Sequence, residues 1–201
     1  MLEANRVAWG CSTRNGGQAQ ISSGRLKRSQ WIERWGLDVA RRLHAEVAEG
    51  FDLFRNLVRE IDCDPQDGGH LYIAHKPSVM PVLEAESRLL NNSFGYRSRI
   101  VSRAEVQADF VNDAEAAGAM YEPDGMGIHA AKLAFGYQTL ARRLGARVHP
   151  GSPVIGWESS GNVHRLRTPG GTVRARTVAL ATAGYTPPGL NILTRHRLMP
   201  V

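Results

Sequence analysis

A long amphipathic pattern extends over residues 29–61. From Ser29, a residue suited to cap a helix, large apolar side chains recur every three or four positions. The positions are Trp31, Trp35, Val39, Leu43, Val47, Phe51, Phe54, Val58 and Ile61. This period matches one face of an α-helix, so the sequence predicts a single long helix whose aromatic residues pack into a core.

The middle of the chain alternates short apolar runs with shorter helical patterns. Strands are expected at 71–74, 99–101 and 118–121, and helices at 78–92 and about 129–144. Ser102 and Glu105 have the spacing of a capping box, which predicts a brief helix after the second of these strands. Gly145 is a suitable residue to end the last helix.

The pattern changes after Gly145. Short strands are expected at 147–148, 154–158, 163–167 and 172–176, separated by glycine-containing turns. Together they predict an antiparallel meander. The meander leads into Val178–Thr182, a continuous run of small residues that is typical of a strand covered on both faces.

The start of the chain has a different character. Met1–Ala4 has the pattern of the last residues of a strand, and residues 5–28 form a long polar stretch without apolar period. Long loops in compact domains are often functional, and this one contains Arg14-Asn15-Gly16-Gly17-Gln18. Taken alone, Asn15–Gly17 also suits a tight surface turn.

Composition narrows the classes of function. With 42% hydrophobic and 22% charged residues, the 201-residue chain is typical of a soluble globular protein. Its net charge of +6 comes from arginines spread along the sequence, which does not favour nucleic-acid binding. Cys11 and Cys63 lack the spacing of a metal site or disulfide framework, so we expect no metal and a reducing cytoplasm. No apolar run approaches the roughly 20 residues of a membrane span.

The segment from Glu3 to Gln18 closely resembles the segment after the second strand in the D-amino-acid-oxidase-like family, especially its gamma-glutamylputrescine oxidoreductase-like branch. The resemblance implies that FAD is the cofactor. In that family an acidic residue binds ribose, and the stretch after it runs under the pyrophosphate and flavin ring. The implied FAD contacts are Glu3, Ser12, Arg14, Asn15, Gly16, Gly17 and Gln18. Hydroxyl, amide and guanidinium donors suit a diphosphate, and glycines allow backbone to approach a flat ring.

Two later segments resemble the same family. Ser152-Pro153-Val154 is similar to the segment in which a residue near Val154 lays its backbone against the adenine. Ala181–Gly184 is similar to the family's second glycine-containing turn, which faces the pyrophosphate and implies contacts from Thr182, Ala183 and Gly184. This chain departs from the family pattern by carrying Ala183 before Gly184.

The resemblance implies an α/β fold with an α+β insert. We expect a Rossmann-like FAD-binding domain in two parts, 1–61 and 128–201, which includes the meander, and part of an inserted substrate-binding domain at 62–127. The family's preceding strand with its G-x-G-x-x-G turn and its C-terminal part are not matched, so the chain is expected to be a fragment. Loss of a central strand would leave unpaired edges.

The implied activity is oxidation of the C–N bond of a small amine or amino acid. Hydride passes to the flavin, and the imine product hydrolyses; oxygen or another acceptor then takes the electrons. Two alternatives stay open: a flavoprotein of this fold with a non-amine substrate, and an inactive binding protein. His70, Tyr72 and His75 equally suit packed or solvent-facing strand positions, so no catalytic residue is assigned. The substrate and the oligomeric state are likewise not assigned.

Overall fold

The computed structural model describes residues 1–22 and 24–185. The chain divides into two compact units. The larger unit comprises residues 10–137, and the smaller unit combines residues 1–9 with the described residues from 138 onward. Among the described residues, no helix is both long and apolar enough to cross a membrane. The predicted boundaries at 61/62 and 127/128 divide the chain by expected function, into cofactor and substrate domains, whereas the two units are divided by compactness. The functional boundaries stay a prediction.

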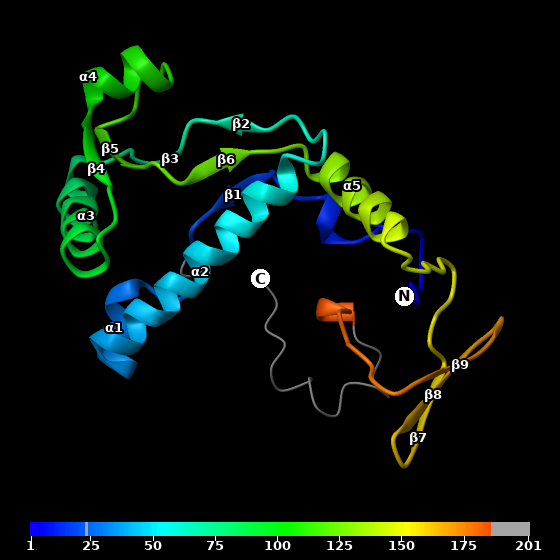
Figure 1. The fold of residues 1–201 in the computed structure, drawn as a ribbon. Helices are drawn as coiled ribbons and strands as arrows, with labels where there is room; N and C mark the ends of the chain where they lie inside the picture. The colour runs from blue at the N-terminus through cyan, green and yellow to red at the C-terminus, as the bar shows by residue number, and fades with distance from the viewer. Residues whose placement is uncertain (23, 186–201) are drawn as a thin grey trace. The chain divides into compact units, whose positions relative to one another are not determined.

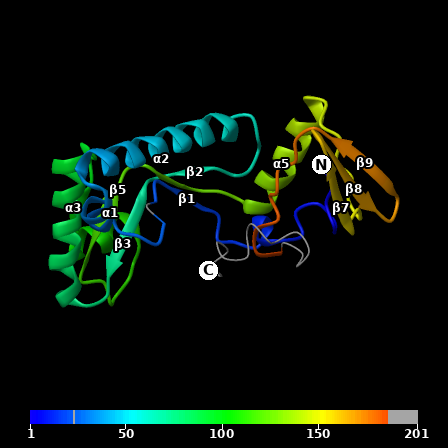
Figure 2. The same ribbon diagram turned by 90° about the horizontal axis from the view of Figure 1, so that it is seen from below.

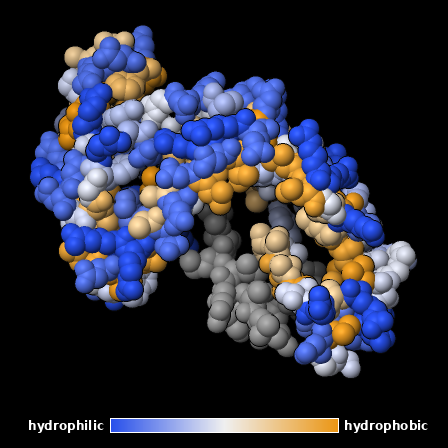
Figure 3. Space-filling model, in the orientation of Figure 1, coloured by the Kyte–Doolittle hydropathy of each residue, from blue (hydrophilic) through white to orange (hydrophobic). Residues whose placement is uncertain are grey.

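The first helical pattern forms two helices, α1 (Arg28–Trp35) and α2 (Leu37–Val58). The prediction of one uninterrupted helix is wrong, because Gly36 has φ 79° and ψ 163°, a conformation open almost only to glycine. Trp31 and Phe51 are buried as expected, whereas Trp35 beside the break is 47% exposed. Figure 3 shows hydrophilic side chains along one side of α2 and hydrophobic ones along the other, as the period predicts.

An antiparallel sheet of order β3-β5-β4 forms one end of the larger unit. Its strands are β3 (His70–Ala74), β4 (Arg99–Ser102) and β5 (Gly118–Glu122), close to the predicted positions. The 3-10 turn η2 (Pro77–Val79) and helix α3 (Met80–Phe94) follow β3. The Ser102 hydroxyl accepts the Glu105 backbone N–H at 3.2 Å and so caps the brief α4 (Arg103–Glu105), which continues into a π-helical turn, η3 (Val106–Phe110).

A second sheet of order β1-β6-β2 lies alongside α2 (Figures 1 and 2). Its strands are β1 (Gln18–Gln20), β6 (Gly125–Gly127) and β2 (Gln66–Asp67). The prediction of an unbroken loop over residues 5–28 is therefore wrong. The loop also contains a 3-10 turn, η1 (Cys11–Thr13). Gln18–Gln20 form a strand because β6, more than 100 residues further along the chain, supplies the partner.

The smaller unit contains the predicted antiparallel meander. It consists of β7 (Gly156–Ser160), β8 (Val163–Thr168) and β9 (Gly171–Ala175). Helix α5 (Ala130–Arg143), also as predicted, spans the boundary between the units at 137/138, and Gly145 follows it with a positive φ of 88°.

Two predicted strands of the smaller unit differ from the structure. The expected strand at 147–148 is not part of the meander, because this segment pairs in parallel with residues 1–3 through a Leu2–His149 bridge. Val178–Thr182 is mostly exposed and forms no strand, because no described segment supplies ladder hydrogen bonds to it. The short 3-10 turn η4 (Ala183–Tyr185) follows.

Candidate functional site

Residues 11–17, here called the glycine loop, are folded by the side chain of Asn15. Its Nδ2 donates to the backbone oxygens of Cys11 at 2.9 Å and Ser12 at 3.3 Å. Its Oδ1 accepts the Gly17 N–H at 2.9 Å. The side-chain amide of Asn15 therefore shapes the loop. A contact of Asn15 with FAD stays a prediction, and it would use atoms of the residue that these hydrogen bonds leave available.

Gly17 fixes the glycine loop against the end of β6. Its φ is +71°, and a Cβ at this position would lie 1.9 Å from the backbone oxygen of Ile128. The Ile128 N–H donates to the Gly17 oxygen at 2.8 Å. Any other residue would disrupt this close approach. Neighbouring Gly16 is exposed with nothing within 4 Å of a Cβ, so its backbone is open to a ligand.

Polar groups able to serve an anionic ligand surround this exposed backbone. The side chains of Ser12, Arg14 and Gln18 are all exposed. Ser12 and Arg14 offer a hydroxyl and a guanidinium, the donors that a diphosphate requires. Gln18 opens β1 opposite Gly127 and extends the set into the sheet.

A pocket of about 340 Å³ lies next to Gln18 in the larger unit. It is lined by Gln18, Ala19, Gly68, Gly69, His70, Leu71, Phe110, Val111, Met126 and Gly127. None of these side chains is charged at neutral pH, since burial lowers the pKa of His70 below its ordinary value. The histidine ring also packs edge-on against Tyr72, with 4.5 Å between centroids.

His70, Tyr72 and His75, which lie on or next to β3, have different surroundings. His70 contributes to the pocket wall. His75 is exposed and bonds through Nε2 to Asp113 Oδ2 at 2.8 Å, and neither it nor Tyr72 lines the pocket. The sequence carried a weak signal for His70, its position directly after Gly68-Gly69, where the backbone turns into β3.

In the smaller unit, Glu3 and the segment before Val154 lie side by side. The backbone of Glu3 donates to His149 O at 3.0 Å and accepts from Ser152 N at 2.8 Å. The Glu3 carboxylate takes the Asn5 N–H on Oε1 at 2.9 Å, while Oε2 receives no hydrogen bond from the described residues. That oxygen is available to a ribose hydroxyl. Val154 is half-buried two residues beyond Ser152.

The last of the predicted FAD contacts, Thr182 and Ala183, lie in a short exposed turn. Thr182 O accepts the Tyr185 N–H at 3.0 Å, and Ala183 has φ 46°, in the left-handed region that favours glycine. The Tyr185 ring packs edge-on against Trp9 at 5.7 Å. A left-handed residue at Ala183 agrees with the predicted turn around Ala183 and Gly184, although the strand expected before it is absent.

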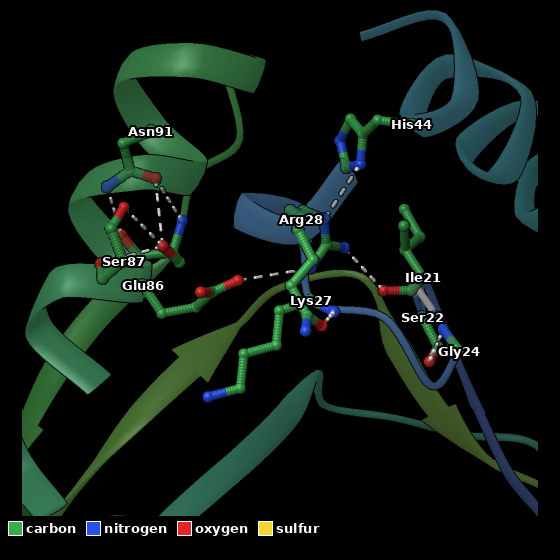
Figure 4. A network of polar contacts seen from close by, with 11 residues as sticks. Ile21, Ser22, Gly24, Lys27, Arg28, His44, Glu86, Ser87 and Asn91 are labelled. Carbon is green, nitrogen blue, oxygen red and sulfur yellow. Dashed lines mark hydrogen bonds and ion pairs between the residues drawn. The ribbon is translucent and has the colours of Figure 1, made fainter. Parts of the chain in front are cut away.

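Sequence reasoning missed a cluster of buried polar side chains in the larger unit (Figure 4). Arg28, only 5% exposed, donates through Nη2 to Ile21 O at 3.0 Å and through Nε to His44 Nδ1 at 3.3 Å. Its Nη1 lies 4.0 Å from Glu86 Oε1. Glu122 at the end of β5 is 1% exposed, and its Oε2 has no hydrogen-bond partner.

Taken unit by unit, the chemistry of the predicted contact residues suits parts of FAD. In the smaller unit, Glu3 Oε2, which receives no hydrogen bond from the described residues, suits a ribose hydroxyl. In the larger unit, the donors of the glycine loop suit a diphosphate, and the open surroundings of Gly16 suit a flat ring. The hydrogen bonds of Asn15 and the close approach at Gly17 give this loop its defined shape.

Comparison with known proteins gives matches over the whole chain. A family model described as FAD dependent oxidoreductase matches residues 1–201. Gamma-glutamylputrescine oxidoreductase of Escherichia coli (strain K12) is 28% identical over 98% of this chain and 49% of its own length. The chain spans about half the length of the curated relatives it matches.

Solved structures share the fold. Glycine oxidase from Geobacillus kaustophilus superposes with a TM-score of 0.70 and 23% identity, over 90% of this chain and 47% of that one. L-Amino acid deaminase from Proteus myxofaciens gives a TM-score of 0.65 and 18% identity, over 86% and 37%. At these identities the likeness concerns the fold.

Proposed function

This chain belongs to the family of FAD-dependent oxidoreductases, and on that premise we propose that the protein oxidises the C–N bond of a small amine or amino acid. The observation that carries the proposal is the 28% identity to gamma-glutamylputrescine oxidoreductase, which extends over 98% of the chain. The protein would act in the cytoplasm on a diffusible substrate. Residues 1–61 and 128–201 would serve the cofactor, and residues 62–127 would serve the substrate.

The residues predicted to hold FAD have separate tasks. Glu3 Oε2 would accept a ribose hydroxyl, and the exposed Ser12 and Arg14 would donate to the diphosphate. Gly16 would present backbone to the ring, and the backbone of Val154 would lie on the adenine. The remaining candidates are Asn15, Gly17, Gln18, Thr182, Ala183 and Gly184. Bound FAD supplies the hydride acceptor for the reaction.

We assign the pocket beside Gln18 to the substrate side of the reaction. Its lining combines apolar Leu71, Phe110 and Met126 with a neutral His70. Such an uncharged lining favours an uncharged portion of the substrate. His70 offers one hydrogen-bond donor and one acceptor in this state.

Two measurements test the proposed function. The first is titration of this chain, and of the complete reading frame that encodes it, with FAD, followed by flavin fluorescence. The second is anaerobic addition of amines to the FAD-loaded protein. The panel contains gamma-glutamylputrescine, putrescine, sarcosine, glycine, proline and D-amino acids, with glycerol 3-phosphate as the non-amine compound. Loss of oxidised-flavin absorbance reports hydride transfer.

The outcomes separate the alternatives. Bleaching by an amine or amino acid supports the proposal. Bleaching by glycerol 3-phosphate, but by none of the amines, assigns a non-amine substrate. A complete reading frame that binds no FAD, or that binds it and is reduced by no compound tested, identifies an inactive binding protein.

A further inference from the structure

The smaller unit carries the excess of positive charge in this chain. Its described residues contain eight arginines, no lysine and two acidic side chains. In the larger unit, acidic side chains outnumber arginines and lysines. Four of the eight arginines belong to the meander: Arg165 and Arg167 on β8, Arg174 on β9 and Arg176 directly after it. The fold therefore gathers positive charge on the meander.

The register of the meander places three of these arginines on one face. Arg165 lies directly opposite Arg174 on β9, and Arg167 is two positions from Arg165, on the same face of β8. Arg167 has a partner, since its Nε lies 3.8 Å from Glu158 Oε1 on β7. The exposed side chains of Arg165, Arg174 and Arg176 make no hydrogen bond, ion pair or ring contact with any described residue. These three guanidinium groups are therefore available to an anionic partner.

Two of these arginines repel each other. Like charges directly opposite each other on neighbouring strands destabilise a sheet, and Arg165 and Arg174 occupy such a pair of positions. On the other side of Arg165, β7 places Glu158 opposite it. Across the sheet the row therefore consists of Glu158, Arg165 and Arg174, and it stops at β9. Local rules of this kind are broken most often at functional or strained sites.

The strand β9 lies at the edge of the meander. The strand order is β7-β8-β9, and no described segment pairs with the other side of β9 (Figure 2). Its residues Gly171–Arg174 are all exposed, so backbone N–H and C=O groups along this edge can accept an added strand. Arginines on an edge discourage neutral or basic strands from pairing with it. They favour an acidic strand, because opposite charges that face each other stabilise a sheet.

We propose that the β9 edge, with Arg165, Arg174 and Arg176, is the docking site for an acidic segment of a protein partner, which adds to the meander as a further strand. An acidic side chain opposite Arg174 continues the row in which Glu158 faces Arg165. The segment carries acidic residues at every second position, because these share one face of a strand. A polypeptide fits better than other polyanions, since it alone can pair with the open backbone of β9. The contact uses neither the glycine loop nor the pocket beside Gln18, so it is independent of the proposed oxidation.

Binding of labelled peptides of about ten residues to the whole chain, followed by fluorescence anisotropy at about 0.05 M salt, tests this docking site. The first peptide alternates Glu and Thr, and the second carries Gln in place of each Glu. The third has the composition of the first, with all Glu residues before all Thr residues. We expect the alternating acidic peptide to bind about tenfold more tightly than the Gln peptide and about threefold more tightly than the block peptide. On binding, the backbone amides of Gly171–Ala175 should gain protection from hydrogen exchange.

Two double variants with the same loss of charge make the test specific. Arg174→Gln combined with Arg176→Gln should weaken binding of the alternating acidic peptide about tenfold. Arg34→Gln combined with Arg42→Gln, at exposed sites of the larger unit, should change it less than about twofold. Because Arg174→Gln also removes one of two facing like charges, urea unfolding should show no loss of stability in the first variant.

Equal binding of the acidic and Gln peptides overturns the proposal, and so does an equal loss of binding in the two double variants. Equal binding of the alternating and block peptides, without protection of the β9 amides, means attraction by charge alone and overturns the added strand. A single-stranded oligonucleotide of similar length that binds more tightly than the alternating peptide would assign this face to nucleic acid. Self-association of the chain that blocks the peptide would assign it to a second copy. Either result also overturns the proposal, and neither bears on the oxidation of amines.

Discussion

Gly16 and Gly17 are neighbours that tolerate an added methyl group very differently. Gly17 combines a positive φ with a backbone oxygen at 1.9 Å from the position of a Cβ, whereas nothing lies within 4 Å at Gly16. The protein's own packing therefore requires glycine at position 17. It does not require glycine at position 16, where close approach of the proposed FAD ring would explain the lack of a side chain.

Replacement of each glycine by alanine separates these two roles. Gly17→Ala should destabilise the chain by about 3 kcal/mol, because strain and a backbone clash combine. Gly16→Ala should change the free energy of unfolding by less than about 0.5 kcal/mol, yet weaken FAD binding. Urea unfolding and FAD titration of both variants provide the measurements. Equal stability losses in the two variants would contradict the assigned geometry.

The raised pKa of Glu122 predicts a pH-dependent stability. Because this pKa is about 7 in the fold against an ordinary 4.5, the folded state holds the proton more tightly than the unfolded state does. Stability is therefore full below about pH 4.5 and falls as the pH rises to about 7. The loss attributable to Glu122 is at most about 3.5 kcal/mol, from 1.36 kcal/mol per pKa unit.

Urea unfolding at a series of pH values checks this expectation. Glu122→Gln should remove the loss between about pH 4.5 and pH 7 and make the variant more stable than the natural chain at pH 8. Natural and variant curves that run parallel over this range would show that Glu122 is not the group responsible.

Some residues of interest could be identified from the sequence, and others could not. The glycine loop could be identified because Asn15, Gly16 and Gly17 are adjacent and their chemistry is local. Arg28 and Glu122 could not, since they are 94 positions apart in the sequence and their burial depends on tertiary packing in the larger unit, where α1 packs on α2 and α3 packs on β5. Nothing in the local pattern of either residue distinguishes it from the exposed arginines and glutamates of the same chain.

Two glycines of the long helical region should respond in opposite directions to the same substitution. Gly36 separates α1 from α2 in a conformation that alanine adopts only with strain, so Gly36→Ala should cost about 2 kcal/mol. Gly50 is exposed inside α2 with no neighbour within 4 Å, so Gly50→Ala should stabilise by about 1 kcal/mol. Denaturant unfolding of both variants measures the contrast; a stabilising Gly36→Ala would mean that one continuous helix is accessible.

At the scale of elements, the sequence was informative wherever the signal is periodic or local. The helices α2, α3 and α5, the strands β3, β4 and β5, and the meander lie close to the predicted positions. The polar strand β1 was missed because Gln18–Gln20 has no strand pattern of its own and depends on distant β6. Val178–Thr182 was predicted as a strand from its apolar residues, but a strand also requires a partner, and no described segment provides one.

Over the whole molecule, the net charge of +6 should assist an anionic cofactor. FAD binding should weaken several-fold between about 0.05 and 0.5 M salt, as the Debye length shortens. Arg14→Gln should weaken binding about tenfold at low salt and reduce this salt dependence. Arg142→Gln, at the end of α5, is the matched control. FAD affinity that is independent of salt and of Arg14 would remove Arg14 from the proposed contacts.

The family could be inferred from sequence because three separate segments resemble it in the same order. They include Glu3–Gln18, Val154 and Thr182–Gly184, so they extend over almost the whole chain. The substrate could not be inferred in this way. The pocket proposed for it is lined by residues on separate strands and turns, three of them glycines, and such a surface leaves no contiguous motif.

The parallel pairing of the first residues with residues 147–152 has a consequence for the order of folding. The Met1 amino group and its acceptor, Arg147 O, are 146 positions apart, so closing this contact costs about 4 kcal/mol of chain entropy by the logarithmic loop law. During synthesis, at roughly 5–20 residues per second, the Glu3 segment leaves the ribosome about 7–30 seconds before its partner. Residues 10–137, which make up the larger unit, leave the ribosome before Arg147 does, so that unit can form first. Glu3, the residue proposed to bind ribose, pairs with its partner segment only afterwards.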